Sequence, residues 1–359
     1  MAANDPATRA EPSSTTDRNV KHVVLGNLLF QTWYQSIYPE DLVSKDTDRL
    51  YVCRWCFRYS CDAHAYTKHT RLCPHRQSPP GVKVYEQGGY SVWELDGEHH
   101  KLYAQNLSLF AKLFLDHKSV FFDVVSFLYY LLVYSDPNDP DSNYHVLGFF
   151  SKEKLSWDAN NLACILVFPP YQHKQLGKLL MGVSYKISSW ERDRSLIGGP
   201  ERPLSEMGRR SYSRFWEDRV ARYLLLHGRK AEDAEDFAVP QKSKSLKGLK
   251  RKHAHEFMTV QDIGLATGML TEDVITALKG LSVVQPATPS KKRKSKDWNE
   301  ATNAGHGTFV TVRKTTVLEW AKSHHMALWD PVKDEGFHGK WAPTDSDVSD
   351  GDSNESGDG

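Results

Sequence analysis

The sequence predicts an α+β protein made of several structural units, and three observations lead to this prediction. Four of the five cysteines lie close together in residues 53–73, a continuous apolar run at 162–168 precedes a helical pattern, and a two-helix pattern begins near residue 257. The chain has 359 residues, of which 40% are hydrophobic and 25% charged. This composition is typical of a folded protein with two or three domains and excludes a collagen, a coiled coil or a fully disordered chain.

Residues 1–21 are polar and rich in Ser and Thr, so we expect a disordered N-terminus. They lack the apolar centre of a secretory signal, which predicts a reducing compartment in which the cysteines stay free. The longest apolar stretch, at 120–134, falls short of the roughly 20 residues that cross a bilayer. We expect this stretch to lie in the core and the protein to have no contact with membranes.

The cysteine cluster, in a unit expected at 22–80, has the ligand spacing of a structural zinc site. Two residues separate Cys53 from Cys56, and three separate His69 from Cys73. The first pair can bind one tetrahedral ion from a tight turn, and the second pair lies on successive turns of a short helix. Three further potential ligands are assigned to surface or packing roles: Cys61, His64 and His75.

A second unit, expected at 81–228, contains a segment that passes from a strand through a loop into a helix. The apolar run from Leu162 to Phe168 predicts a strand buried on both faces. Apolar residues then recur with helical spacing at Leu176, Leu179, Leu180, Val183 and Ile187. Unpaired backbone amides at a helix N-terminus can bind an anion, and nearby His and Lys side chains add positive charge. Many such junctions bind nothing, so this pattern alone leaves phosphate binding open.

A third unit is expected at 257–343. Thr259 with Asp262 predicts a capped helix, Gly268 its end, and Thr271 the start of a second capped helix. An apolar strand at 309–312 gives this unit a winged-helix outline. Such a unit can bind DNA or serve as a packing module, and the sequence favours packing.

Strongly charged segments separate and follow these units. The expected insertion at 229–256 has six basic and no acidic residues between Lys242 and Lys252, and the insertion at 284–307 has a second basic run at 291–296. The tail at 344–359 has six acidic residues and no basic one. We expect all three to be disordered. The basic runs fit a nuclear import signal, weak non-specific contact with nucleic acid, or a solvated linker.

Considered together, these motifs resemble the MYST histone acetyltransferases over roughly residues 22–343. The matching residues are Thr32-Trp33-Tyr34, Tyr38-Pro39, the four Cys/His ligands, Leu102-Tyr103, Gln105-Asn106-Leu107, Lys112 to Lys118, Gly148 to Lys154, Ala163 to Leu166, Pro200 to Ser205, and Trp341-Ala342-Pro343. No chromodomain, bromodomain or plant-homeodomain finger precedes residue 22, which resembles the small silencing-type branch of fungi.

The resemblance implies a GNAT-like mixed-sheet core that binds acetyl-CoA, flanked by the C2HC zinc finger and the helix-turn-helix unit. It implies that the acetyl and pantetheine groups contact Ala163, Cys164, Ile165, Leu166 and Val167. It implies that the pyrophosphate contacts Gln172, His173, Lys174, Gln175, Leu176, Gly177 and Lys178. Ser205 matches a further cofactor contact.

The resemblance also assigns the catalytic residues. Glu201 matches the family's general base, which the substrate lysine needs because its ammonium has a pKa near 10.4. An apolar pocket around Gly198, Gly199 and Pro200 would raise the pKa of this carboxylate towards the working pH. Cys164 matches the active-site cysteine, and we favour direct attack by the amine over an acetyl-cysteine intermediate. Lys112 aligns with a lysine that becomes self-acetylated in the family.

Two departures from the family pattern concern the pyrophosphate loop. Gln175 stands where the family has glycine, which weakens cofactor binding unless the local φ is negative. His173 replaces an arginine, so a permanent charge becomes one that is largely lost at pH 7.

The leading hypothesis is a nuclear histone acetyltransferase that acts on histone tails in nucleosomes, with H4 as the expected substrate, as a subunit of a multiprotein chromatin complex. The alternatives are a catalytically weakened homologue that acts as a scaffold and a zinc-finger/helix-turn-helix transcription factor.

Overall fold

The computed structural model describes residues 18–139, 143–158, 160–191, 198–227, 256–283 and 309–343. The charged segments expected at 229–256, 284–307 and 344–359 therefore lie outside the described residues, apart from Glu256. Within the described ranges, no helix is long and apolar enough to cross a membrane. The chain divides into two compact units. The first comprises Met1–Leu155, Ala163–Leu176 and Glu335–Gly359, and the second comprises Ser156–Leu162 and Gly177–Asp334.

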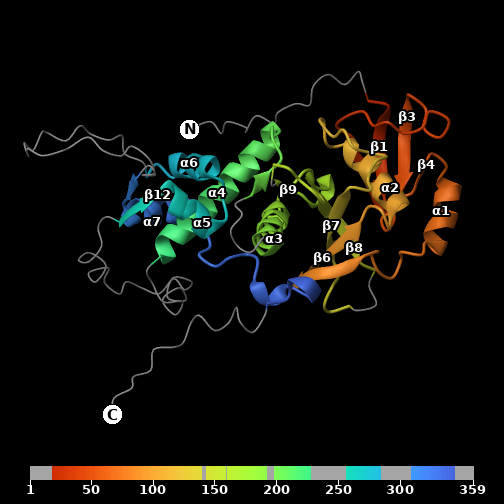
Figure 1. Ribbon diagram of the computed structural model, residues 1–359. Coiled ribbons are helices and arrows are strands. Elements are labelled where there is room, and N and C mark those ends of the chain that lie inside the picture. Colours follow the sequence, from red (N-terminus) through yellow and green to blue (C-terminus); the bar gives the residue numbers. More distant parts are fainter. Residues whose placement is uncertain are drawn as a thin grey trace, which may run out of the picture. The chain divides into compact units, whose positions relative to one another are not determined.

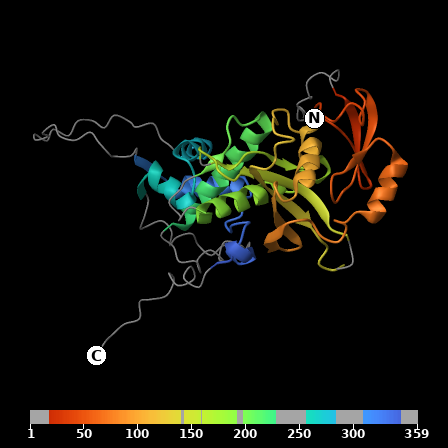
Figure 2. The same cartoon turned by 45° about the vertical axis from the view of Figure 1, so that its right-hand side comes forward.

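The first unit begins with a small sheet and a helix. Its elements are β1 (Val20–Leu25), β2 (Leu28–Gln31), β3 (Thr47–Val52), β4 (Tyr59–Ser60) and α1 (Ala63–Leu72). The strand order is β2-β1-β3-β4, with β1 and β3 parallel. Asp62 caps α1 by accepting a hydrogen bond from the backbone N–H of His64 at 2.8 Å. In Figure 2, α1 (orange) lies beside the strands (red). The sequence places the ordered chain from residue 22, and β1 begins slightly earlier, at Val20.

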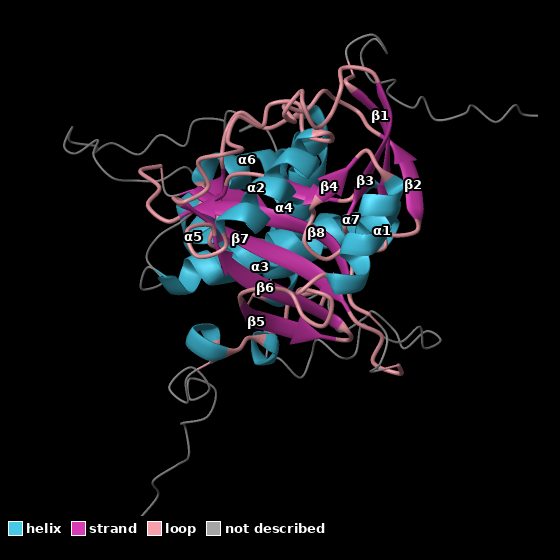
Figure 3. Cartoon of the chain, turned by 90° about the vertical axis from the view of Figure 1, so that its right-hand side faces the viewer, coloured by secondary structure: helices cyan, strands magenta, loops and turns pink. Residues whose placement is uncertain are grey.

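The centre of the first unit is a five-stranded antiparallel sheet, with helix α2 (Lys101–Lys112) in the same hydrophobic core. Its strands are β5 (Val82–Gln87), β6 (Tyr90–Asp96), β7 (Phe127–Tyr134), β8 (His145–Glu153) and β10 (Ile165–Val167), in the order β10-β8-β7-β6-β5. Figure 3 shows β5 to β8 side by side. All of β7 except Leu128 and Tyr134 is buried, so the end of the long apolar stretch is core, as the sequence predicts.

The apolar run at 162–168 does not form the single strand that its sequence predicts. It divides between β9 (Asn160–Leu162) in the second unit and β10 in the first. Ala163 and Cys164 both pair with Ser151 of β8: the N–H of Ala163 donates to the Ser151 carbonyl, and the N–H of Ser151 donates to the Cys164 carbonyl, each at 2.8 Å. Two residues opposite one make a β-bulge, which redirects the chain. Because β10 is the last strand of its sheet, Ile165 and Val167 are only half-buried.

The second unit is mainly helical. Its remaining elements are α3 (Leu176–Glu191), β11 (Gly199–Pro200), α4 (Glu206–Leu226), β12 (Glu256–Thr259), α5 (Val260–Thr267), α6 (Thr271–Gly280), β13 (Phe309–Val312) and α7 (Lys314–Ser323). Figure 1 shows α5, α6 and α7 gathered around the long helix α4, which contacts all three. Aromatic residues of α4, among them Tyr212, Phe215 and Trp216, are buried. Their burial supplies much of the hydrophobic stabilisation of this unit.

The predicted helix-turn-helix is confirmed, with one correction. Thr259 and Asp262 form both hydrogen bonds of a capping box at α5, and Gly268 ends this helix in the left-handed conformation with φ 65°. Helix α6 begins as expected at Thr271, but its N-cap is Leu270, which makes no side-chain cap. Strands β12 and β13 pair antiparallel, which gives the winged-helix outline. The sequence reasoning did not identify α7.

The segment 335–343 returns to the first unit and lies against β5. Phe337 forms an isolated antiparallel bridge with Tyr85, and the N–H of His338 donates to the Val84 carbonyl at 3.0 Å. Lys340 pairs with Glu94 of β6 at 2.6 Å. These contacts cover the outer edge of the sheet, where unpaired backbone groups would otherwise be exposed.

Candidate functional site

The structure brings together the four predicted zinc ligands. The ligand atoms of Cys53, Cys56, His69 and Cys73 all lie within 4.8 Å of one another. The sulfurs of Cys53 and Cys73 are 3.8 Å apart, and the sulfur of Cys56 is 3.2 Å from Nε2 of His69. Two sulfurs bound to one tetrahedral zinc at about 2.3 Å lie about 3.8 Å apart. The geometry of this donor set therefore fits zinc with all four positions occupied by protein ligands.

The three thiols of this cluster differ in acidity. A hydrogen bond from Cys56 lowers the pKa of the Cys53 thiol to about 5, and thiolate is the form that binds metal. The same hydrogen bond raises the pKa of Cys56, and burial raises that of Cys73. The other potential ligands point to other partners, as predicted. The sulfur of Cys61 donates to the Leu42 carbonyl, and the ring of His75 packs against Tyr103. Among the described residues, the only group with ligand atoms close enough for a metal is the Cys3His cluster.

The bulge at Cys164 places this residue beside a lysine that the sequence reasoning did not connect with it. The backbone N–H of Cys164 donates to Oγ of Ser151 at 3.3 Å, which fixes the bulge. Nζ of Lys118 lies 3.9 Å from the Cys164 sulfur, and Lys118 is only 7% exposed. Lys118 belongs to one of the family motifs quoted above, but it lies 46 residues before Cys164. No local pattern signals their contact.

The loop before α3 has a backbone that suits anion binding. Pro169–Tyr171 form a short 3-10 turn, and the loop then reaches α3 through His173 and Gln175, whose φ angles are 64° and 63°. Within the described chain, the amide groups of residues 173–175 have no backbone acceptor. Gly177 faces open space, because a Cβ there would meet no atom within 4 Å. Free amides and the positive end of a 16-residue helix thus converge on open space.

The sequence left open whether the φ angle of Gln175 is negative, and the structure shows that it is positive. Glycine adopts this conformation freely, whereas a residue with a Cβ is strained there. His173 carries the same strain two residues earlier.

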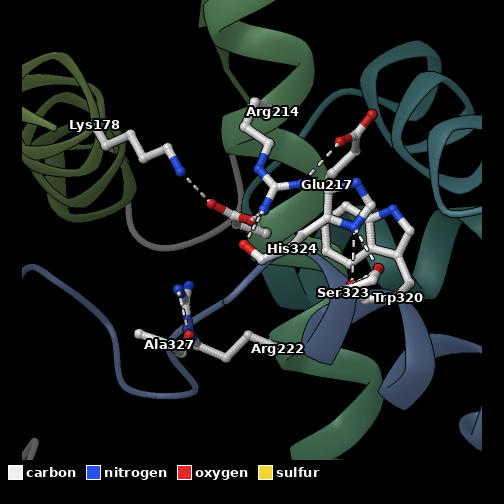
Figure 4. Close-up of polar contacts among 9 residues, drawn as sticks. Lys178, Arg214, Glu217, Arg222, Trp320, Ser323, His324 and Ala327 are labelled. Atoms are coloured by element: carbon white, nitrogen blue, oxygen red, sulfur yellow. Dashed lines mark hydrogen bonds and ion pairs between the residues drawn. The ribbon is translucent and has the colours of Figure 1, made fainter. Parts of the chain in front are cut away.

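The charge of Lys178 is paired within the second unit. Its Nζ lies 2.5 Å from Oδ2 of Asp218 on α4, and Asp218 also pairs with Arg214 at 3.3 Å. Figure 4 shows the side chain of Lys178 extending from α3 towards α4, and the guanidinium of Arg214 on α4 donating to the His324 carbonyl. The permanent positive charge that the sequence assigns to the loop therefore comes from the exposed side chain of Lys174.

Glu201 lies in the second unit, directly after β11. Its backbone N–H donates to the Leu162 carbonyl at 2.9 Å, and Gly198 bridges to Met269 before α6. Gly199 packs closely against α6, because a Cβ there would lie 2.8 Å from the Leu270 side chain and 3.1 Å from Oδ2 of Asp273, and these side chains would have to shift. The side chain of Glu201 is exposed within this unit, and the apolar pocket around it stays a prediction. The buried residues are Gly198 to Pro200, because they pack towards α6 while the chain turns outward at Glu201.

Two further predicted residues have local roles in the fold. Ser205 is the N-cap of α4, and its Oγ accepts a hydrogen bond from Gly208 at 3.1 Å. Nζ of Lys112 donates to the Asp116 carbonyl at 2.8 Å. Partial burial lowers the pKa of Lys112.

Comparison with known proteins assigns both parts of the chain. Residues 78–312 match the MOZ/SAS family, and residues 17–73 match the MYST family zinc finger domain. The chain belongs to the MYST family. The Cys3His cluster is thus the structural zinc site of the MYST finger, and the central antiparallel sheet with its mixed α+β surroundings is the GNAT-like core that the sequence predicts.

Several MYST proteins are similar to this chain. The Caenorhabditis elegans protein named histone acetyltransferase Tip60 homolog is 37% identical over 274 residues, covering 76% of this chain and 53% of that protein. Drosophila melanogaster histone acetyltransferase MOF is 35% identical over 286 residues, covering 79% and 30%. Arabidopsis thaliana histone acetyltransferase of the MYST family 1 is 35% identical over 277 residues, covering 77% and 54%. The chain thus matches about half or less of these relatives' lengths.

Proposed function

We propose that the protein is an acetyl-CoA-dependent histone lysine acetyltransferase. The observation that carries this proposal is the strand, bulge, loop and helix from β10 to α3. Its free amides, two left-handed residues and open space at Gly177 suit a pyrophosphate. MYST membership supports acetyl-CoA as the co-substrate and histones as the acceptors.

Cofactor contacts are proposed at the residues that the resemblance names. The backbone of Ala163 to Val167 would hold the acetyl and pantetheine groups, because β10 is the last strand of its sheet and, among the described residues, pairs along one edge only, with β8. The amides of the loop from Gln172 to Lys178 would hold the pyrophosphate, with Ser205 as a further contact.

The proposed reaction is direct transfer. Glu201 takes a proton from the substrate ammonium, and the freed amine attacks the thioester carbonyl. The C–S bond then breaks, the proton that the attacking nitrogen loses passes to the departing sulfur, and CoA leaves as the thiol. The exposed carboxylate of Glu201 is accessible to such a substrate, and its backbone is held by β9. Cys164 lines the pocket in this route and carries the acetyl group in the alternative one.

The test is a comparison of Glu201→Gln with Cys164→Ala on core histones. A general base contributes about 10²- to 10⁴-fold. Glu201→Gln should therefore lower the maximal rate at neutral pH by at least about a hundredfold and recover partly as pH rises, because solvent then deprotonates more lysine. Acetyl-CoA affinity should stay nearly unchanged. Cys164→Ala should cost far less. Loss of activity in Cys164→Ala, with Glu201→Gln near wild type at every pH, would instead support an acetyl-cysteine route.

The finer parts of this proposal concern substrate and location. The relatives named as histone acetyltransferases support a nuclear protein that acts on histone tails, with H4 as the proposed tail, within a multiprotein chromatin complex. Self-acetylation at Lys112 is a further part of the proposal. The unit boundaries given above for the finger, the acetyl-CoA core and the helix-turn-helix also remain proposals.

A transcription factor is the weaker alternative. In a DNA-binding helix-turn-helix, the start of the second helix faces the major groove. Here the first turn of α6 carries the exposed acidic side chain of Glu272, whose charge opposes contact with phosphates. Buried Val274, Ala277 and Leu278 indicate instead that α6 is a packing helix.

A further inference from the structure

Arg202, the residue after the proposed base, is held by the start of α6. Its guanidinium hydrogen-bonds to Oδ1 of Asp273, and its Nε lies 2.9 Å from Oε1 of Glu272. The guanidinium also lies over the ring of Trp216 on α4, 5.8 Å from the ring centroid. The two acidic partners differ in exposure: the side chain of Glu272 is 62% exposed and that of Asp273 is 1% exposed.

Asp273 depends on Arg202 for its charge balance. Its second oxygen, Oδ2, has no hydrogen-bond partner among the described residues and lies against Gly199. The charged and titratable groups that face this carboxylate are Arg202, Glu272 on its own helix, Tyr185 on α3 and Tyr212 on α4. Arg202 is the only cation that contacts it directly within the described chain. A buried carboxylate with one cationic partner holds that partner firmly, because separating the pair leaves a charge without compensation.

The backbone at Glu201 is therefore held by two contacts. On one side its own N–H is bonded to the Leu162 carbonyl of β9. On the other side Arg202 is fixed to Asp273. These two contacts hold the Cα of Glu201 in place.

We propose that Asp273 is a positioning residue for Glu201 and acts by clamping Arg202 to the start of α6. This inference rests on the proposed function, in which Glu201 is the general base. A carboxylate displaced by about 1 Å from its substrate proton can lose on the order of a hundredfold in rate. The clamp thus makes the helix-turn-helix unit part of the catalytic machinery, although it touches no substrate.

The experiment measures kcat, KM and acetyl-CoA affinity for clamp variants of the full chain. Asp273→Asn and Arg202→Gln should each lower kcat about 10- to 100-fold and leave acetyl-CoA affinity within about twofold. Arg202→Lys keeps the positive charge and should retain at least about a third of kcat. The matched control is Glu272→Gln, which removes the exposed partner on the same helical turn and should change kcat less than about twofold.

The decisive measurement repeats the Asp273→Asn substitution in a variant that already lacks the proposed base. In a Glu201→Gln background, Asp273→Asn should cost less than about twofold, because residues that act as one unit are not additive. A purely structural role would lower the residual rate equally in both backgrounds. Thermal unfolding identifies variants that do not fold, and if Asp273→Asn is among them, Arg202→Gln and Arg202→Lys decide.

The outcomes separate the two levels of the proposal. If Glu201→Gln is inactive while folded Asp273→Asn keeps wild-type kcat, the clamp is wrong and the base assignment stands. The clamp is also wrong if the costs of Asp273→Asn and Glu201→Gln multiply. If Glu201→Gln itself keeps wild-type kcat, the base assignment is wrong, and the clamp falls with it.

Discussion

Replacing Gln175 with glycine should tighten acetyl-CoA binding. Gln175 has φ 63° and lies in the loop whose amides are proposed to bind the pyrophosphate. A left-handed conformation costs a residue with a Cβ roughly 1–2 kcal/mol relative to glycine. In the free protein these amides have no backbone acceptor among the described residues, so little opposes relaxation of the loop into less strained conformations. Strain at Gln175 thus lowers the fraction of molecules that are ready to bind.

The expected gain follows from two opposing effects. Relief of strain favours the binding conformation by roughly 1–2 kcal/mol. The greater conformational freedom of glycine favours the other conformations of the free loop by about 0.4–1 kcal/mol and so opposes binding. With central values the net gain is about 1 kcal/mol, which corresponds to about fivefold in affinity, because apparent affinity scales with the fraction of the binding-competent state.

The assay is calorimetric titration with acetyl-CoA at fixed pH and salt. Gln175→Ala is the matched control, because both variants lose the amide side chain and only glycine loses the Cβ. The glycine variant should bind up to about five times more tightly than the alanine variant, with both unfolding at similar temperatures. Equal affinities, or tighter binding by the alanine variant, would refute the argument that backbone strain at Gln175 limits cofactor binding.

Three further predictions concern other sites. Metal analysis should find about one zinc per chain. Because metal binding and folding are coupled, Cys56→Ser should unfold the finger and Cys61→Ser should not. A stably folded, metal-free protein would contradict this prediction. Burial raises the pKa of Asp273 from 3.8 to about 6, so the folded chain binds this proton more tightly than the unfolded chain. The free energy of unfolding should then fall by about 2 kcal/mol as pH rises from 4 to 6, and denaturation of Asp273→Asn should lack this component. After incubation with acetyl-CoA alone, mass spectrometry should find an acetyl group on Lys112; acetylation confined to Lys118 would contradict that assignment.

The sequence by itself determined the features that depend on neighbours in the chain. The zinc ligands lie within 21 consecutive residues, and their spacing alone limits them to one knuckle and one short helix. The capping box of α5 and its end at Gly268 follow from contacts three or four residues apart. The loop before α3 was visible as a break between two apolar patterns.

Only the tertiary structure decided how the candidate site is organised. The run at 162–168 divides because Ser151, on another strand, pairs with both Ala163 and Cys164. Lys118 contacts Cys164, which is 46 positions later in the sequence, and Arg202 contacts Asp273, which is 71 positions later. These contacts depend on sheet register and on the packing of α6 against α4, which are global properties of the folded chain. Local spacing therefore indicated which residues are candidates for the chemistry, and long-range packing determined which of them are held in place by distant parts of the chain.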